Sequence, residues 1–532
     1  MVEQVNMSSQ NGSVHLNGHH HDHSSTKTKA AEDTSLLGPS YKQILKSRAL
    51  YPMLIIASVQ AAPILYDKLR VQAFFHDVAM QIPSTVDTYT VCLMLVAAAL
   101  TYLAYYFVYV PGPILMLDFS CFKPDDCTRV SKRTYVEKAK RSGFFSEKSL
   151  DFQEKVLALS GLGDETYAPP STLLEPVDRS LKATHSEAQA CIFGVADEIF
   201  SQGIVKPKNV DILVLNCSMY SPVPSLAAMV VNKYKMRKDI EVYNLGGMGC
   251  SAGLIAIDLA CKILKGRRNS YALVISTEII SAQFGYPGNQ RSMMVGNCLF
   301  RTGSAGVLLS NRRADRWRAK YEMEHLVRTN NGADDASYNC VHSTQDEAGN
   351  IGISLSRDLM RAAGTVLKDN ITTLAPKILP LSEKVKFAIN YIAIKLNKGQ
   401  KPTIKPYMPN FKKAVSHFAI HPGGRAVLEG VAEKLDLDDW YMEPSKMTLH
   451  RFGNTSSSSV WYVMAYLEAK GRVKKGDRVW QIALGSGLKC NSVIWKSLKT
   501  AQEGPSKNCW ATFIDKYPME IDTTLPQPQS EK

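Results

Sequence analysis

The sequence has no pair of closely spaced cysteines matched by a second pair, which is the spacing that structural zinc sites use. Its 11 cysteines are an odd number scattered over 532 residues, and Cys121 and Cys127, six positions apart, have no matching pair elsewhere. This distribution is typical of reduced thiols facing the cytosol and argues against a disulfide framework. The amino terminus also lacks the pattern of a secretory signal peptide.

Signatures of nucleic-acid binding are missing as well, because there is no RNP motif, no zinc finger and no long Lys/Arg tract. The chain is nevertheless basic, with 63 Lys and Arg against 49 Asp and Glu, a net charge of +14 and a pI near 9.1. A positive field favours anionic partners such as phosphorylated cofactors or acidic lipid surfaces.

The first 40 residues are rich in Ser, Asn, His and Gly and predict a disordered tail. Within this tail, the run HHHDH at residues 19–23 either binds a metal ion or is simply solvated, and the solvated interpretation is favoured. The segment after residue 504 contains Pro, Gln and Ser and predicts a second, loosely ordered tail over 505–532.

Charged residues are absent from Thr88 to Leu117, and the apolar core of this run, 88–110, has the length of about 20 residues that a membrane-spanning helix needs. A shorter apolar run at 49–66 contains prolines and predicts either a second span or a re-entrant partner. Basic residues lie before the first apolar run and after the second, so both ends of this pair of membrane segments are expected to face the cytosol. We therefore predict a membrane anchor over 41–117 and a cytosolic catalytic domain after it.

Strand-like and helix-like stretches alternate through the remaining chain, which predicts an α/β domain with mixed sheets covered by helices. Two similar halves, 118–315 and 316–504, suggest an internal duplication. The expected strands are VDILVLNC, IEVYNL, YALVIST, SAGVLLS, SHFAIHP and VWQIALGSG, and the expected helices are residues 221–236, 251–265 and 423–435.

Cys250 follows one of these strands in NLGGMGCSAG and stands at the start of an expected helix. A helix amino terminus stabilises a thiolate and lowers the cysteine pKa, and the glycines leave space above the sulfur. A buried small cysteine at a tight turn explains the same pattern. Taken alone, the motif leaves packing and chemistry both open.

Histidines and an asparagine later in the chain favour chemistry. His417 and His421 lie in SHFAIHPGGRAV, with His421 at the end of a strand, and LHRFGNTSSSS supplies His450 and Asn454. The order Cys, His, Asn suits a thiolate nucleophile with a base and a polar partner. Asn454 is also a good helix cap before the serines, so its structural role stays open at this point.

Seven long stretches together resemble the plant 3-ketoacyl-CoA synthases, the condensing enzymes of microsomal fatty-acid elongation. The resemblance covers roughly residues 110–500 and is far more specific than any single motif. The stretches are GLGDETY (161–167), NCSMYSPVPSLAAMVVNKYKMR (216–237), YNLGGMGCSAG (243–253), RSMMVGNCLFRTGSAG (291–306), SHFAIHPGGRAVLEG (416–430), HRFGNTSSSSVWYV (450–463) and LGSGLKCNS (484–492).

The resemblance implies a thiolase-like, five-layered αβαβα core made of two duplicated halves, preceded by transmembrane helices, and a homodimer. It implies Cys250 as the acyl-accepting nucleophile and His421 and Asn454 as the other members of a catalytic triad. His417 and His450 match further histidines near the family's site. Backbone amides of Cys250 and Ser486 are expected to form the oxyanion hole.

One departure from the family concerns VRTNNGADD, where Asn330 stands at a position often occupied by histidine. An amide donates a hydrogen bond but does not exchange a proton near neutral pH. The difference puts a supporting role in doubt and leaves the triad intact.

The implied reaction extends a long-chain acyl-CoA by two carbons with malonyl-CoA as the donor, without a metal or another cofactor. The resemblance also implies an endoplasmic reticulum membrane and association with the reductase and dehydratase of the elongase. Three other classes of protein share parts of this pattern. A papain-like hydrolase would carry C-G-S-C-W and a signal sequence; a biosynthetic thiolase would carry a second cysteine earlier than Cys490; and an inactive scaffold would not need all three triad residues.

Overall fold

The computed structural model describes residues 88–281, 285–396, 405–501 and 508–521. The predicted tail over 1–40 and the first predicted membrane segment, 49–66, lie outside these residues. The chain divides into two compact units, Met1–Val108 and Tyr109–Lys532.

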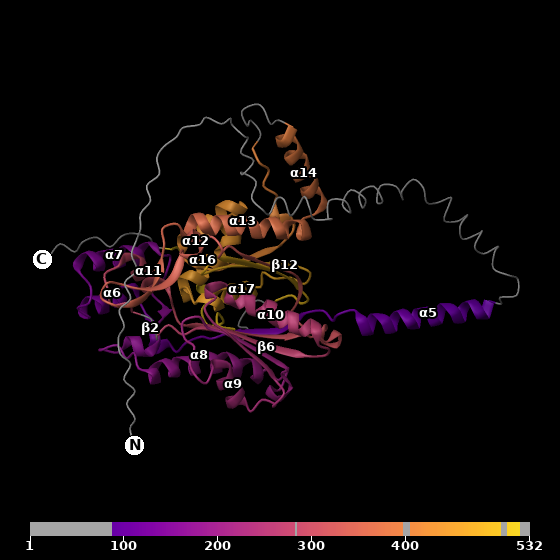
Figure 1. Cartoon of the computed structure of the whole chain (residues 1–532), viewed down its shortest axis with the longest axis horizontal. Helices are drawn as coiled ribbons and strands as arrows, with labels where there is room; N and C mark the ends of the chain where they lie inside the picture. Colours follow the sequence, from indigo (N-terminus) through magenta and orange to yellow (C-terminus); the bar gives the residue numbers. More distant parts are fainter. Residues whose placement is uncertain (1–87, 282–284, 397–404, 502–507, 522–532) are drawn as a thin grey trace, which may run out of the picture. The chain divides into compact units, whose positions relative to one another are not determined.

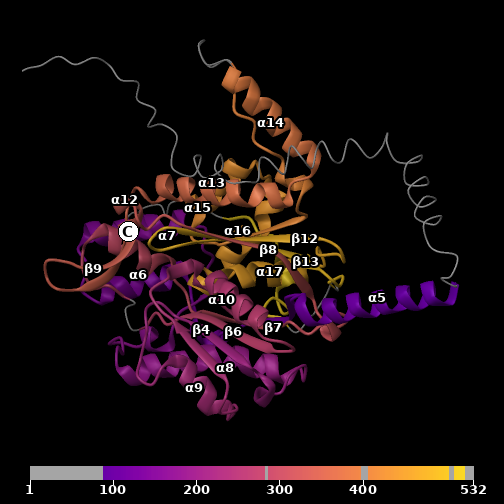
Figure 2. The same ribbon diagram turned by 45° about the vertical axis from the view of Figure 1, so that its right-hand side comes forward.

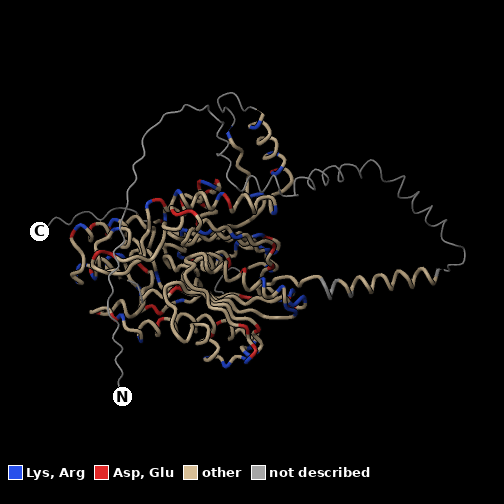
Figure 3. The backbone as a smooth tube through the Cα atoms, in the orientation of Figure 1, with Lys and Arg blue, Asp and Glu red and all other residues tan. Residues whose placement is uncertain are grey.

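Helix α5 (Thr88–Tyr109) covers the second predicted membrane segment and has 22 residues. It carries no charged residue, as its uniform tan colour in Figure 3 shows, and large apolar side chains such as Leu95 and Leu100 are exposed. Across the described part of the chain, however, no helix combines the length and the apolar character needed to cross a membrane. The predicted helix is therefore present, and its predicted passage through a bilayer is not confirmed.

The described part of the second unit is organised by one mixed sheet of nine strands, in the order β11-β12-β13-β8-β1-β7-β6-β4-β5. Figure 1 labels two of these strands, β6 and β12. This confirms the predicted α/β class with mixed strand directions. The strands are β1 (Leu115–Cys121), β4 (Ile212–Asn216), β5 (Glu241–Leu245), β6 (Tyr271–Glu278), β7 (Gly303–Ser310), β8 (Tyr321–Asn330), β11 (His417–Ile420), β12 (Arg478–Gly485) and β13 (Lys489–Ser497).

The sheet consists of two groups of strands that repeat one pairing pattern. In the first group β1 pairs antiparallel with β7, β7 antiparallel with β6, and β6 parallel with β4. In the second group β8 pairs antiparallel with β13, β13 antiparallel with β12, and β12 parallel with β11. Only a short register between β1 and β8, at Leu115↔Glu322 and Met116↔Tyr321, joins the two groups.

Two central helices, α10 (Ala252–Gly266) and α17 (Ser459–Ala469), contact strands of both groups, and Figure 2 shows them between the two. Helix α17 is buried on nearly all sides, as a helix with apolar residues around its circumference must be. The outer faces are covered by α8 (Leu181–Ser201) and α9 (Leu226–Tyr234) on the first group, and by α13 (Leu359–Ile378), α15 (Arg425–Leu435) and α16 (Asp439–Phe452) on the side of the second.

Smaller elements complete the described chain. The helices are α6 (Lys132–Arg141), α7 (Glu147–Leu159), α11 (Arg291–Leu299), α12 (Asp335–Tyr338) and α14 (Leu381–Leu396), and two short sheets pair β2 (Arg129–Val130) with β3 (Thr166–Tyr167) and β9 (Val341–Gln345) with β10 (Ile351–Leu355). The 3-10 turns are η1 (Asp126–Thr128), η2 (Pro170–Leu173), η3 (Pro207–Asn209), η4 (Gly249–Ser251), η5 (Arg313–Asp315), η6 (Phe411–Lys413), η7 (Ser456–Ser458) and η8 (Ile514–Lys516).

The carboxyl-terminal segment differs from the loosely ordered tail that was predicted. Within the described residues 508–521, Trp510 is fully buried and its ring lies 5.1 Å from Phe452 and 4.9 Å from Tyr466. Its indole N–H donates to the Tyr462 carbonyl at 3.0 Å. Burial of several large apolar side chains contributes more free energy than the segment loses in conformational entropy when it becomes ordered. This segment therefore packs onto the core.

Candidate active site

Cys250 stands on η4, the turn between β5 and helix α10. The Gly249 N–H donates to the Ser218 hydroxyl at 2.9 Å, and Gly249 has a φ of +64°, which disfavours other residues. A Cβ atom on Gly249 would lie 2.7 Å from the Ser486 backbone nitrogen. The glycine is therefore required because the turn after β12 packs directly against it, a second reason beyond the predicted access to the sulfur.

Three glycine substitutions separate strain from contact at this turn. We expect Gly249→Ala to lower the free energy of unfolding by about 1–3 kcal/mol or more, because it adds backbone strain and a steric clash. Gly247→Ala, with a φ of +65° and open space around it, should lower the free energy of unfolding by less. Gly266→Ala, at the end of helix α10, should be neutral or stabilising. Thermal unfolding of the purified chain measures all three. Equal losses for Gly247→Ala and Gly249→Ala would show that the contact with Ser486 is unimportant.

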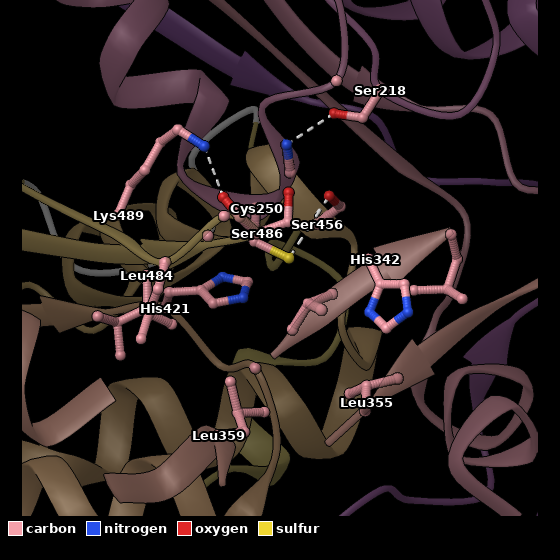
Figure 4. A pocket seen from close by; sticks show the side chains of 18 of the residues that line it. Ser218, Cys250, His342, Leu355, Leu359, His421, Ser456, Leu484, Ser486 and Lys489 are labelled. Atoms are coloured by element: carbon pink, nitrogen blue, oxygen red, sulfur yellow. Dashed lines mark hydrogen bonds between the residues drawn. The ribbon is translucent and has the colours of Figure 1, made fainter. Parts of the chain in front are cut away.

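Five of the predicted site residues line one cavity of about 620 Å³. Figure 4 labels three of them, Cys250, His421 and Ser486. Each comes from the end of a strand or the start of a turn, so sequence segments more than 200 residues apart converge on one place. The five residues are Cys250, Asn330, His421, Asn454 and Ser486.

His421 and Asn454 are connected through the turn that follows β11, which contains His421 and Gly423. The His421 backbone N–H donates to Ile482 on β12 at 2.8 Å, and the Asn454 amide donates to the Gly423 carbonyl at 3.2 Å. A Cβ atom on Gly423 would lie 3.2 Å from the His421 ring, so a side chain there would press on the imidazole. Among the described residues, the buried Nδ1 atom of His421 has no hydrogen-bond partner.

The predicted helix-capping role of Asn454 is wrong, because the residue at the N-cap of η7 is Thr455, which makes no side-chain capping hydrogen bond. The Asn454 Oδ1 atom accepts from the Ser456 N–H at 2.8 Å at the start of η7, and this hydrogen bond fixes one end of the amide.

The electrostatics of Cys250 differ from the sequence expectation. Burial raises the pKa of the Cys250 thiol to about 11, and the nearby Glu278 carboxyl adds to the increase. The expected lowering by a helix amino terminus is wrong for this structure, because Cys250 lies in a 3-10 turn before α10 and desolvation outweighs the favourable contacts. Burial also lowers the pKa of His421 to about 4, so thiol and imidazole are both neutral near pH 7.

These pKa shifts predict how alkylation depends on pH. With a thiol pKa of about 11, roughly 1 in 10⁴ Cys250 side chains is a thiolate at pH 7, and this fraction rises about tenfold for each pH unit. We therefore expect the iodoacetamide reaction rate of Cys250, followed by mass spectrometry of its peptide, to increase about tenfold per unit from pH 7 to 9. A constant rate over this range would instead indicate a preformed thiolate–imidazolium pair with His421.

His417 and His450 do not line the cavity. His417 stands at the start of β11, where its Nε2 atom lies 3.0 Å from Asp477 Oδ2. The His450 Nδ1 atom lies 3.1 Å from the Tyr517 hydroxyl. The structure brings neither ring to Cys250, and their supporting role stays a prediction.

The sequence interpretation missed Glu278 and Ser456. Glu278, at the end of β6, is buried and accepts hydrogen bonds from the backbone of Ser218 at 2.8 Å and of Met219 at 2.6 Å. The Ser456 hydroxyl donates to Glu278 at 3.0 Å and lies 3.7 Å from Cys250 Sγ. Glu278 thus joins the loop after β4 to η7 beneath the cysteine. The one sequence signal was an acidic residue closing an otherwise apolar strand.

His342 and Lys489 also line the cavity without having been predicted. His342 Nδ1 lies 2.9 Å from the Asn339 carbonyl, which only accepts, so this nitrogen carries the proton. Lys489 donates to the Ser486 carbonyl at 2.6 Å, and burial lowers its pKa. No local pattern around either residue distinguishes it from a surface side chain.

The described residues contain no cluster of three or more His, Cys, Asp or Glu side chains that could hold a metal ion, and the 19–23 run lies outside them.

Asn330 reaches the cavity, where its Oδ1 atom accepts from the Gly332 N–H at 3.0 Å. Cys490 is buried in β13 opposite Thr329 and does not line the cavity, which agrees with its exclusion as a second nucleophile.

Comparison with known proteins identifies related families along most of the chain. Residues 106–396 match the family described as FAE1/Type III polyketide synthase-like protein, and residues 411–497 match the carboxyl-terminal domain of 3-oxoacyl-[acyl-carrier-protein] synthase III. Two relatives from Arabidopsis thaliana are 3-ketoacyl-CoA synthase 11, 50% identical over 81% of this chain and 83% of its own, and 3-ketoacyl-CoA synthase 4, 46% identical over 90% of both chains.

Solved structures with the same fold are more distant in sequence. CsyB in complex with CoA aligns with a TM-score of 0.57 and 18% identity, over 72% of this chain and 100% of its own. A type III pentaketide synthase from Neurospora crassa aligns with a TM-score of 0.53 and 18% identity, over 72% of this chain and 99% of its own. These similarities establish the thiolase-like fold of the type III polyketide synthases.

Proposed function

The chain belongs to the 3-ketoacyl-CoA synthase family, and we propose that its Cys250 cavity carries out the condensation that begins each cycle of fatty-acid elongation. The enzyme is an acyltransferase that joins an acyl-CoA to malonyl-CoA. The observation that carries the assignment of the site is the convergence of Cys250, His421 and Asn454 on one cavity.

The first step transfers the acyl group to the protein. Cys250 sulfur attacks the thioester carbon of a long-chain acyl-CoA, the carbon–sulfur bond to CoA breaks, and CoA leaves as a thiolate that takes a proton from solvent. Because Cys250 and His421 are both neutral at rest, His421 accepts the thiol proton as the sulfur attacks and keeps it until the second step. We assign the Cys250 and Ser486 backbone amides the role of holding the thioester oxygen in this step.

The second step uses malonyl-CoA. Loss of carbon dioxide leaves an electron pair on the adjacent carbon, and the negative charge is shared with the thioester oxygen. His421 and Asn454 donate hydrogen bonds to that oxygen, and an asparagine suits this role because it donates without acting as a base. The carbanion attacks the acyl-cysteine, the bond from the Cys250 sulfur to the acyl carbon breaks, Cys250 takes its proton back from His421, and the product is a 3-ketoacyl-CoA two carbons longer.

The setting of the reaction belongs to the same proposal. We place the enzyme at the endoplasmic reticulum membrane with its catalytic domain in the cytosol, as a homodimer associated with the reductase and dehydratase that process its product. The uncharged run over 88–117 and the apolar nature of long acyl chains support membrane attachment. The repeated strand pairing supports an origin of the core by duplication.

The function is tested by incubating microsomes that express the chain with labelled malonyl-CoA and acyl-CoAs of different lengths. We expect labelled 3-ketoacyl-CoA for at least one chain length and none in microsomes from the empty host. A wild-type chain that yields no product at any length would favour the inactive scaffold over the enzyme.

A further inference from the structure

Helix α14 (Leu381–Leu396) exposes more large apolar side chains than its neighbours in the catalytic unit. Both ribbon views show it projecting from α13, away from the strands (Figures 1 and 2). Among the described residues, none of its side chains belongs to a hydrophobic core cluster. The helix therefore presents an apolar surface that the described fold leaves uncovered.

Five of the seven large apolar side chains that α14 exposes form one continuous stripe, and the other two, Phe387 and Tyr391, lie on other sides of the helix. At 100° per residue the five fall within an arc of about 80°. Their exposed fractions are 73% for Leu381, 46% for Val385, 63% for Ile389, 54% for Ile392 and 83% for Leu396. We call these five residues the α14 stripe.

The opposite face of α14 is fixed to the protein. Glu383 is fully buried and accepts hydrogen bonds from the Tyr407 hydroxyl at 2.5 Å, the Lys413 ammonium at 2.8 Å and the Asn410 N–H at 3.1 Å. Asn390, on the same side as Glu383, accepts from the Tyr407 N–H at 2.8 Å. These contacts hold the helix with its stripe pointing outward.

The charges beside the stripe are all positive. Lys384 and Lys395 flank one edge and Lys386 lies beyond the other, and Figure 3 shows basic residues along the helix. Residues 381–405 contain six lysines and a single acidic residue, the buried Glu383. Two copies of α14 packed stripe to stripe would bring lysines together with no exposed acidic partner on either helix, which disfavours pairing with a second copy.

We propose that α14 lies on a membrane surface rich in anionic phospholipids, with its stripe inserted among the acyl chains and its lysines at the headgroups. An apolar stripe bordered by lysines is the pattern of an interfacial helix, and each lysine adds attraction to an anionic leaflet. This contact holds the catalytic unit at the bilayer independently of α5, and it does not depend on which reaction the cavity performs.

Photocrosslinking in the full-length chain tests the proposal. A benzophenone amino acid replaces Ile389 on the stripe or, as the matched control, Leu181 at the start of α8, which is 71% exposed. Each protein is reconstituted into vesicles of labelled phosphatidylserine and phosphatidylcholine and irradiated. We expect at least about tenfold more lipid adduct at position 389 than at position 181.

Two results would overturn the proposal: equal lipid adducts at both positions, or an adduct at position 389 with twice the mass of the chain, which would identify a second copy as the occupant. A second variant tests the charges, in which Lys384 and Lys395 are both changed to glutamine, while Lys386 is kept because it lies 3.7 Å from the buried Glu383 carboxylate. It should lose most of the preference for phosphatidylserine over phosphatidylcholine while its thermal unfolding stays unchanged. An undiminished preference would show that the lysines do not contact the headgroups.

Discussion

Replacing Cys250 with alanine is expected to lower condensation by at least about 10⁴-fold, because no other group in the described cavity supplies a sulfur nucleophile. The substitution removes the atom that carries the acyl group between the two steps. Two readouts follow from this role: labelled acyl-CoA should no longer attach to the protein, and labelled malonyl-CoA should yield no 3-ketoacyl product. Both are measured on the same microsomal preparation.

The matched control is Cys261→Ala on helix α10, the helix that follows Cys250. Cys261 is buried in the core, where burial raises its pKa to about 12, and it does not line the cavity. This variant should keep acyl attachment and product formation within a few-fold of the wild type. Product formation by Cys250→Ala at the rate of the control would mean that the carbanion attacks acyl-CoA directly, and the acyl-cysteine mechanism would be wrong.

Strands and central helices were predictable because their patterns are local. The predicted strand over 210–217 is β4, and the predicted helix over 251–265 is α10, displaced by one residue. The helix predicted over 221–236 begins later, at Leu226, because two prolines precede it and Ser225 caps it by accepting from Ala228 N–H at 3.1 Å.

Site features that depend on distant contacts could not be predicted in this way. Ser456 has a φ of +56°, an unusual value for a serine, and its contact with Glu278 depends on two segments 178 residues apart. The direction of the Cys250 pKa shift depends on how much protein covers the sulfur, which no local motif reports. His342 reaches the cavity only because the β9–β10 hairpin folds over it.

Replacing Asn454 with aspartate is expected to separate the two steps of the reaction. Aspartate keeps the Oδ1 acceptor that holds Ser456 N–H at 2.8 Å, so this hydrogen bond at the start of η7 is retained. It loses the amide donor, which in the free protein reaches the Gly423 carbonyl at 3.2 Å, and it adds a negative charge where the enolate develops. Condensation should therefore fall by about 10²–10³-fold, the usual cost of losing one donor to a developing oxyanion.

Transfer of the acyl group to Cys250 should survive in Asn454→Asp within about tenfold, since we propose that the Cys250 and Ser486 backbone amides, rather than Asn454, hold the oxygen in that step. Rapid-quench measurement of labelled acyl-protein and of 3-ketoacyl product gives the two rates separately. Asn330→Asp is the control, because this amide also lines the cavity and its Oδ1 atom accepts from Gly332 N–H at 3.0 Å. This substitution should lower condensation by less than about fivefold. If Asn454→Asp slows both steps equally and lowers the unfolding temperature, the amide acts by positioning η7, and His421 alone holds the enolate oxygen.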